Sequence, residues 1–328
     1  MNLNPTSNIS RPHHRGQGRR AAFSLIEIIV VVGLMSFIIL GLMQMFNQTQ
    51  RAYKLGTTQV DVLEGGRAVI DMMTRELSQM KPTRANDTTN FYARVSFVGG
   101  YQPLLQELPG VPNPVNAPSL KRTNIIEQMF FLMEENQIWT AIGYFVDTPN
   151  DGVGALYRYE YKSNFGDNPW FLFRRYYLDV ADFYTHQATN NMTRLLEGVV
   201  HLRARAYNTN GYWITDSFAK LTDAFTGQIV GTNGFVIAPY TKSYLAPIFS
   251  LGEVDTYAFK SNAVPASVDL ELGVLEDAAL AKIKALYNPA NAAAQTDSRR
   301  NYITNQAART HLFRIRVPIR NVDPTAYQ

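Results

Sequence analysis

The chain has 328 residues, 46% of them hydrophobic and 12% aromatic, which is the composition of a folded protein and not of a disordered one. Its formal net charge of +4 belongs to residues 1–22, which hold four arginines and no acidic residue; the remainder has 31 − 4 = 27 basic and 27 acidic residues. That remainder is neutral, so no basic excess favours nucleic-acid binding. The absence of cysteine excludes disulfides, thiolate catalysis and cysteine-based metal sites.

Residues 1–22 are polar and are followed by an apolar run of 24 residues, Phe23–Phe46, whose only charge is Glu27. At about 1.5 Å per residue, a helix of that length crosses a hydrocarbon core of roughly 30 Å. A secretory signal would carry a small-residue cleavage site after its apolar run, and Phe46 is followed by no such site. The arginines before the run predict a cytoplasmic N-terminus, with everything after Phe46 outside the cytoplasm.

Glu27 needs an explanation, because a charge at the middle of a membrane costs about 2.5 kcal/mol or more. The stretch Ala22-Phe23-Ser24-Leu25-Ile26-Glu27 resembles the class III signal of type IV pilins and type II secretion pseudopilins. The resemblance implies that prepilin peptidase cuts between Ala22 and Phe23, where the family usually has glycine before the cut. It also implies methylation of Phe23, and an assembly role in which Glu27 neutralises the Phe23 amine of a neighbouring subunit. The alternatives are an ordinary signal anchor and a glutamate that snorkels to the interface.

The helix is expected to continue to about Met80, because residues 47–81 contain no proline and Pro82 follows. Apolar or small residues recur at helical spacing in this part and form one stripe: Leu63, Gly66, Ile70, Met73, Leu77 and Met80. Such a stripe predicts that the second half of the helix packs on a globular domain. A coiled-coil dimer is the alternative.

Several segments after the helix have β character. Phe91–Val98 is strand-like, and Ile125–Met133 and Ile138–Val146 read as a hairpin. Val153–Lys162 and Trp170–Asp179 are expected to be two further strands joined by a longer turn.

Three later segments alternate with period two, so each is predicted to be a strand with one buried face. Their outward sets are, in chain order, basic (His201, Arg203, Arg205 and Tyr207), acidic (Asp269 and Glu271) and basic (Arg314, Arg316 and Arg320). Opposite charges across neighbouring strands are favourable, whereas like charges are not. We therefore expect the acidic strand at 266–272 to lie beside at least one basic strand.

The order of short motifs in residues 195–213 and 264–272 is similar to that in the minor pseudopilin J and minor pilin W families. The motifs are Leu195-Leu196-Glu197-Gly198-Val199-Val200, Gly211-Tyr212-Trp213 and Val264-Pro265-Ala266-Ser267-Val268. Two regions depart from those families and read as insertions: residues 216–263, and residues 276–308, which are expected to form two helices broken at Pro289. The length of the chain and the order of its expected parts also resemble those of a pilin-like protein C of a verrucomicrobial gene cassette.

Motifs for catalysis are missing from the sequence: it has no Walker loop, Rossmann glycine fingerprint, His-Glu-x-x-His or Gly-x-Ser-x-Gly. His201 and His311 are not at metal-ligand spacing and are expected to face solvent on strands. Asp147–Gly152 lacks the acidic pattern of a calcium loop and is interpreted as a turn. The aromatic residues of 157–177 are expected to pack the sheet, with a sugar-binding platform as the alternative.

Together these interpretations predict an α+β, pilin-like fold, in which a long N-terminal helix packs on an antiparallel sheet domain. The expected parts are a cleaved cytoplasmic leader (1–22), a transmembrane and assembly helix (23–46), its amphipathic continuation (47–81) and a β-rich domain (83–328) with insertions at 216–263 and 276–308.

The resemblance implies a structural subunit and not an enzyme, with no cofactor. Such a subunit sits in the bacterial inner membrane with a periplasmic domain, and can be extracted into a type IV pilus or type II secretion pseudopilus, near the tip. Its partners would be other pilins or pseudopilins, prepilin peptidase and the membrane. The alternative is a membrane-anchored β domain that recognises a glycan or an exported protein.

Overall fold

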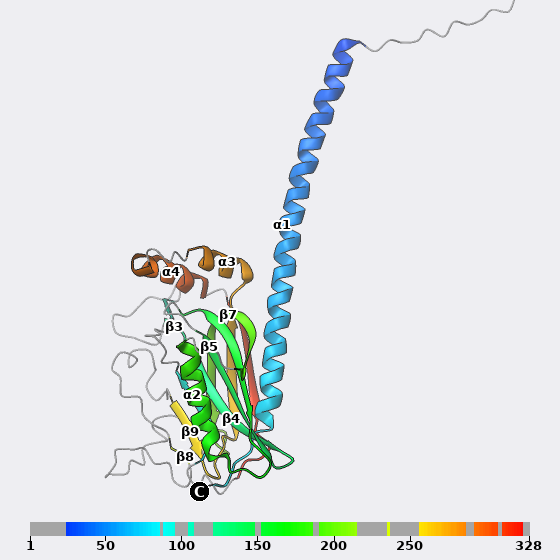
Figure 1. Ribbon diagram of the computed structural model, residues 1–328. Helices are drawn as coiled ribbons and strands as arrows, with labels where there is room; N and C mark the ends of the chain where they lie inside the picture. The colour runs from blue at the N-terminus through cyan, green and yellow to red at the C-terminus, as the bar shows by residue number, and fades with distance from the viewer. Residues whose placement is uncertain are drawn as a thin grey trace, which may run out of the picture. The chain divides into compact units, whose positions relative to one another are not determined.

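The protein has an α+β architecture, in which one long helix precedes a curled antiparallel sheet (Figure 1). The computed structural model describes residues 24–85, 88–95, 104–107, 121–147, 152–185, 190–214, 235–236, 256–286, 292–307 and 310–323. The chain divides into two compact units, Met1–Leu55 and Gly56–Gln328. Helix α1, Leu25–Ser78, begins in the first unit and ends in the second, which confirms the predicted long helix to within two residues at either end.

Within the described residues, nine strands form one sheet in the order β11-β10-β7-β6-β5-β4-β1-β9-β8, with antiparallel neighbours throughout. Their bounds are β1 Thr89–Val95, β4 Glu127–Glu135, β5 Ile138–Asp147, β6 Gly154–Lys162, β7 Met192–Tyr207, β8 Phe235–Val236, β9 Thr256–Lys260, β10 Ser267–Val274 and β11 His311–Pro318. A separate pair consists of β2, Leu104–Glu107, and β3, Lys121–Asn124.

The predicted hairpin is confirmed as β4–β5, but its turn is tighter than expected. Asn136 and Gln137 alone connect the strands, with φ of 51° and 63°. Two successive residues of positive φ give the turn whose twist matches that of the flanking strands. Asn136 adopts this conformation at low cost, whereas Gln137 does so rarely.

The sheet curls because β7 changes partners along its length. Its first part pairs with β6 up to Val199, and its second part pairs with β10. Residues 125–127, at the start of β4, cover the other edge of that second part. The Leu202 amide donates to the Ile125 carbonyl (2.9 Å), and Ile126 forms a parallel bridge with Leu202. Two strands that are not neighbours in the sheet order are thus brought together.

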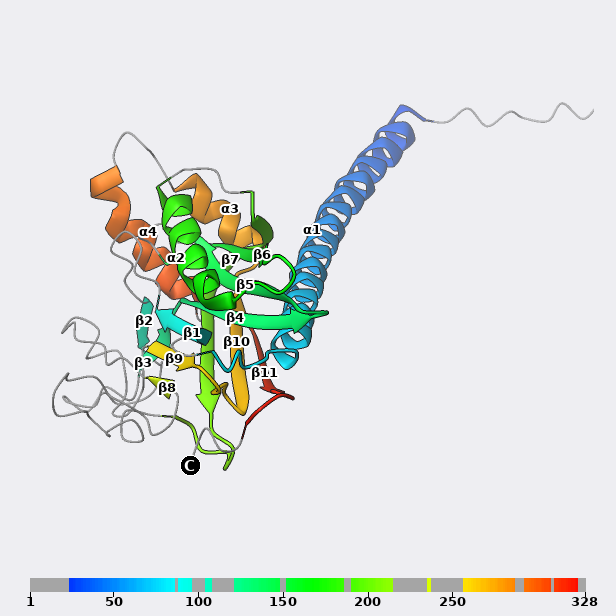
Figure 2. The same cartoon turned by 60° about the horizontal axis from the view of Figure 1, so that its bottom comes forward.

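The second half of α1 packs on one face of the sheet, as its apolar stripe predicts (Figures 1 and 2). Ile70, Met73, Leu77 and Met80 are buried there, together with residues of β4, β5, β7 and β10. Leu63 is the exception in the predicted stripe, since it is 42% exposed. The coiled-coil alternative is not needed for these residues, because their apolar face is covered by the chain's own sheet.

The opposite face of the sheet carries α2, Leu172–Tyr184, preceded by a 3-10 turn at Pro169–Phe171 (Figure 2). The predicted strand Trp170–Asp179 is therefore wrong. Asn168 caps the turn by accepting from the Trp170 amide (3.2 Å), with Pro169 at the first helical position. Leu172, Tyr176 and Val180, four residues apart, are all buried, so the period is helical.

Most of the aromatic residues around α2 pack against the sheet, as expected, but Trp170 and Tyr177 are 60% and 51% exposed. Tyr159 and Tyr176 are fully buried, with ring centroids 5.3 Å apart in an edge-to-face arrangement. Gly143 of β5 makes room for Tyr176, since a Cβ atom there would lie 2.2 Å from its ring.

The predicted helices at 276–308 are confirmed as α3, Asp277–Ala285, and α4, Ala292–Ala307, which lie between β10 and β11 in the chain. Ile283 of α3 and Ile303 of α4 share a small buried cluster with Val200 and Leu275. Of the expected insertion 216–263, only 235–236 and 256–263 belong to the described residues. The expected turn at 147–152 also lies mostly outside them.

Candidate functional site

The first candidate site is the N-terminal part of α1, where the sequence singled out Ala22, Phe23 and Glu27. Ala22 and Phe23 lie outside the described residues. Glu27 is in the first turn of α1 and is exposed.

Ser24 begins the helix and explains part of the local pattern. Its side-chain oxygen accepts from the Glu27 amide (3.3 Å), and its carbonyl accepts from the same amide (3.0 Å). Ser24-Leu25-Ile26-Glu27 thus matches the Ser-x-x-Glu pattern of a helix N-terminus, which is visible in the sequence. An acidic side chain in the first turn also interacts favourably with the helix dipole. Glu27 therefore has a role in its own chain, which any assembly role would add to.

From Leu25 to Phe46, the surface of the helix is apolar on every side except at Glu27. Its large hydrophobic side chains are between 54% and 78% exposed: Leu25, Ile26, Ile28, Ile29, Val30, Val31, Val32, Leu34, Met35, Phe37, Ile38, Ile39, Leu40, Leu42, Met43, Met45 and Phe46. A helix that is hydrophobic all round requires an apolar environment, either lipid or other helices. By length and composition, α1 is able to cross a membrane.

A partly buried ion pair holds the second half of α1 to the sheet. Arg158 of β6 donates to Glu76 of α1 through Nε (3.0 Å) and Nη2 (2.7 Å), and the Tyr144 hydroxyl of β5 donates to the same carboxylate. Burial raises the pKa of Tyr144, and the neighbouring Glu76 charge raises it further. The phenol therefore stays protonated and remains a donor to the carboxylate.

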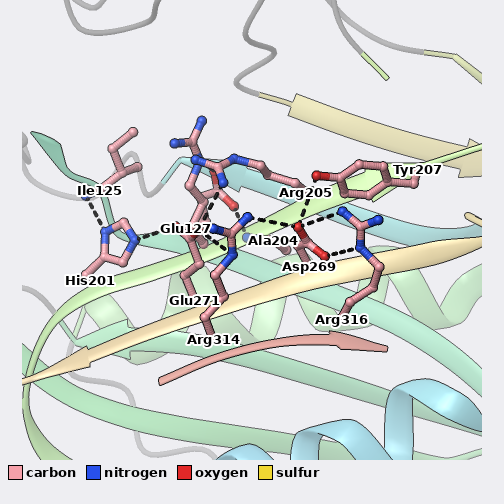
Figure 3. Close-up of polar contacts among 11 residues, drawn as sticks. Ile125, Glu127, His201, Ala204, Arg205, Tyr207, Asp269, Glu271, Arg314 and Arg316 are labelled. Atoms are coloured by element: carbon pink, nitrogen blue, oxygen red, sulfur yellow. Dashed lines mark hydrogen bonds and ion pairs between the residues drawn. The ribbon is translucent and has the colours of Figure 1, made fainter. Parts of the chain in front are cut away.

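The second candidate site is a charged cluster on the face of the sheet away from α1 (Figure 3). We use the name charged cluster for eight residues on β4, β7, β10 and β11: Glu127, His201, Arg203, Arg205, Asp269, Glu271, Arg314 and Arg316. The strand registers place Asp269 between Arg205 and Arg316, and Glu271 between Arg203 and Arg314. The predicted pairing of the acidic strand is thus confirmed, and it occurs with both basic strands.

Asp269 is the most heavily bonded carboxylate of the charged cluster. Its oxygens accept from Arg316 Nε (2.6 Å), from Arg314 Nη2 (3.2 Å) and from the Tyr207 hydroxyl (3.0 Å). Burial alone would raise the pKa of Asp269, but the hydrogen bonds from Arg316, Tyr207 and Arg314 lower it below the usual value. Asp269 therefore stays ionised at neutral pH.

His201 corrects a prediction, because its side chain is only 8% exposed and does not face solvent. Its Nδ1 atom accepts from the Ile125 amide (3.0 Å), while Nε2 lies 3.2 Å from Glu271 Oε2. The alternation along β7 showed which side chains share a face, but not that residues 125–127 cover it. His311, the other histidine expected to face solvent, is partly buried, with Nε2 3.4 Å from Glu276.

Two buried carboxylates of the charged cluster titrate in opposite directions. Burial raises the pKa of Glu127 to about 7, although Arg203 and the hydrogen bond from the Ala204 amide (2.7 Å) oppose the shift. Burial would also raise the pKa of Glu271, but the hydrogen bond from His201 and the charge of Arg205 lower it to about 2. Of these two carboxylates, Glu127 is the one whose protonation changes near neutral pH.

The described residues offer no grouping for metal chemistry, since no three His, Cys, Asp or Glu side chains lie close enough to hold an ion. The charged cluster is instead a set of pairs that satisfy one another across strands. Comparison of the chain with models of known protein families, with curated proteins and with solved structures finds no match.

Proposed function

We propose that the chain is a minor pilin or pseudopilin, a structural subunit that joins a type IV pilus or type II secretion pseudopilus through its N-terminal helix. The observation that carries the proposal is the composition of α1. Its first part is apolar on all sides and long enough to span a membrane, and its second part packs by one stripe on an antiparallel sheet of the same chain. A simple membrane anchor does not require one helix to serve both environments.

The resemblance at Ala22–Glu27 supplies the processing steps of the proposal. Prepilin peptidase removes residues 1–22, the Phe23 amine is methylated, and the mature chain stays in the inner membrane with its sheet in the periplasm. On leaving the membrane, the helix packs among those of other subunits. There the Glu27 carboxylate pairs with the Phe23 amine of a neighbour, because two opposite charges in a low dielectric attract strongly.

The cleavage step is tested by mass spectrometry of the N-terminus after expression of the full chain with and without a prepilin peptidase. With the peptidase, the mature chain should begin at a methylated Phe23, and Ala22→Gly should be cut at least as completely. Without it, residues 1–22 should remain. A chain that keeps them in the presence of an active peptidase contradicts the proposal and favours the alternative of a membrane-anchored binding domain.

The assembly role is tested with a matched pair, Glu27→Gln and Ser24→Ala. The first removes the charge at nearly constant volume, whereas the second removes the side-chain acceptor of the helix N-terminus. We expect Glu27→Gln to reduce incorporation into fibres by about tenfold or more, since it leaves the neighbouring amine unpaired. Ser24→Ala should insert and assemble nearly normally. Equal effects of the two variants would reduce Glu27 to its role at the helix N-terminus.

A further inference from the structure

Strand β11 forms one end of the sheet order and pairs with β10 on one side only. The Ile319 amide donates to the Ala266 carbonyl (3.0 Å), which fixes the alternation of hydrogen bonds along the pair. By this alternation the amides of Phe313, Ile315 and Val317 point to β10, and those of Leu312, Arg314 and Arg316 point away from it. Within the described ranges, these three outward amides have no hydrogen-bond partner.

Pro318 marks the end of this free edge. It occupies the next outward position of β11, where its missing N–H removes a donor from the edge and none from the β10 pairing. The free edge therefore presents three N–H donors at alternate residues, each with the carbonyl of the same residue, which is the arrangement to which an extended chain can add.

The charges of the charged cluster alternate in rows across the strands. One row runs from Glu127 through Arg203 and Glu271 to Arg314, and a second runs from Arg205 through Asp269 to Arg316. The rows contain four arginines and three carboxylates, an excess of one positive charge. Both rows end on a cation at the edge strand, so the next position in each row suits an acidic side chain.

In both rows, the side chains become more exposed to solvent from β10 to the edge strand β11. The Asp269 and Glu271 side chains are only 3% and 11% exposed, whereas those of Arg314 and Arg316 are 56% and 51% exposed. Arg314 is held in place by Asp269 and Glu271, and Arg316 by Asp269 (Figure 3). Both guanidinium groups remain about half exposed to solvent. The edge is thus a fixed, basic surface beside free backbone donors.

We propose that the outer edge of β11 binds an extended acidic segment of another protein, which adds to the sheet as a further strand with carboxylates beside Arg314 and Arg316. Main-chain hydrogen bonds to the three free amides would supply affinity, and the alternating carboxylates would supply specificity and register. The inference is independent of the assembly role proposed above, because it uses residues of the second unit alone.

The charges argue against other occupants. A second copy that added through its own β11 would place arginines against arginines, which is unfavourable across strands. A nucleic acid or an anionic lipid surface would meet the two arginines but would leave the three amides without backbone acceptors. An acidic peptide segment satisfies both features at once.

The test uses the full chain in detergent micelles and three short peptides. The glutamate peptide has glutamate at alternating positions, with valine and threonine between. The lysine peptide has lysine in place of each glutamate. The N-methylated peptide has the sequence of the glutamate peptide, with N-methyl groups on the backbone amides that would face β11. The glutamate peptide should bind, and the lysine peptide should bind about tenfold more weakly or less. The N-methylated peptide should lose binding, because its backbone cannot approach the edge.

Amide hydrogen exchange supplies the readout that a general electrostatic attraction would not produce. On binding, exchange at Leu312, Arg314 and Arg316 should slow, while Phe313, Ile315 and Val317 should change little because they are already bonded to β10. The variant Leu312→Pro removes one outward donor and leaves the β10 pairing intact, so it should weaken binding several-fold without lowering the unfolding temperature.

Four results would overturn the proposal. The first is binding of the lysine peptide as tight as that of the glutamate peptide, and the second is binding without slower exchange at the three amides. A thymidine oligonucleotide or phosphatidylglycerol vesicles could compete fully for the arginines while leaving those amides unprotected, which would indicate a general anion surface. Slower exchange that appears without peptide and grows with protein concentration would assign the edge to a second copy of the chain.

Discussion

At the scale of single residues, the charged cluster shows how neighbouring carboxylates acquire opposite responses to pH. Glu127 and Glu271 both lie near Arg203, yet the pKa of Glu127 is raised to about 7 and that of Glu271 is lowered to about 2. The difference follows from hydrogen bonds: Glu271 has His201 and Arg205 at 3.2 and 2.9 Å, whereas Arg203 is 4.0 Å from Glu127. Burial therefore dominates at Glu127, and pairing dominates at Glu271.

Glu127→Gln tests the first of these shifts. The folded state holds the Glu127 proton more tightly than the unfolded state, so the wild-type protein loses stability as pH rises from about 4.5 to about 7. The amide of Gln still offers an oxygen to the Ala204 N–H. We expect the variant to gain up to about 3 kcal/mol relative to wild type between pH 4 and pH 8, measured by urea unfolding.

Glu271→Gln is the control of opposite sign. Its lowered pKa stabilises the folded state above about pH 4.5, and this stabilisation is lost as pH falls through about 2. The variant should be destabilised by about 3 kcal/mol at pH 7, with the difference shrinking in acid. If the stability difference between either variant and wild type did not change with pH, the corresponding pKa shift would be wrong.

At the scale of elements, the helices and strands that could be predicted are those with both a clear hydrophobic period and clear boundary residues. Helix α1, the strands β10 and β11 and the helices α3 and α4 follow from clear spacing and from stops at Pro82 and Pro289. Helix α2 was missed because β-favouring aromatic residues outweighed the Asn168-Pro169 start signal. Strands β8 and β9 are too short to show a period.

The features of the candidate sites also divide into those that could be predicted from the sequence and those that could not. The pairing of Asp269 and Glu271 with arginines could be predicted, because their charges stand out on an alternating strand. The burial of His201 could not, since it depends on residues 125–127, which are distant in the sequence and cover β7 only after the sheet curls. The cleavage at Ala22 and Phe23 stays a prediction, and so does the assembly role of Glu27.

The packing of α1 on the sheet is tested at Gly66. A Cβ atom there would lie 2.3 Å from the Phe313 ring, a distance that side chains do not tolerate without a shift. Gly66→Ala should therefore cost about 1–3 kcal/mol, despite the better helix propensity of alanine. At Gly56, also in α1, nothing lies within 4 Å of the added atom, so Gly56→Ala should be neutral or stabilising by up to about 1 kcal/mol. Equal unfolding midpoints for the two variants would contradict this close approach.

At the scale of the whole molecule, the two units differ in what stabilises them. The core of Gly56–Gln328 is built from residues beginning at Val62, whereas the apolar side chains of Leu25–Phe46 are exposed. The first unit therefore depends on its surroundings, and the second carries its own core.

Deletion of Met1–Leu55 tests this division. A chain that starts at Gly56 should be soluble without detergent and should unfold cooperatively, with an unfolding temperature within a few degrees of that of the second unit in the full chain. The measurement is circular dichroism during heating, with Gly66→Ala in the same background as a control that must lower the temperature. Aggregation of the shortened chain, or unfolding without cooperativity, would show that the second unit needs the first.

The contacts between α1 and the C-terminal strand also bear on the order in which this protein can fold. Asn321 donates to the Met80 carbonyl across 241 residues, and the last strand, β11, supplies the ring that packs at Gly66. The second half of α1 is thus synthesised long before β11, one of the strands that cover it. Contacts between segments distant in the sequence form late and slowly. The apolar stripe of α1 is therefore fully buried only after β11 has been synthesised. A chain that lacks β11 would leave the part of that stripe around Gly66 uncovered, so full burial of the stripe depends on the complete sheet.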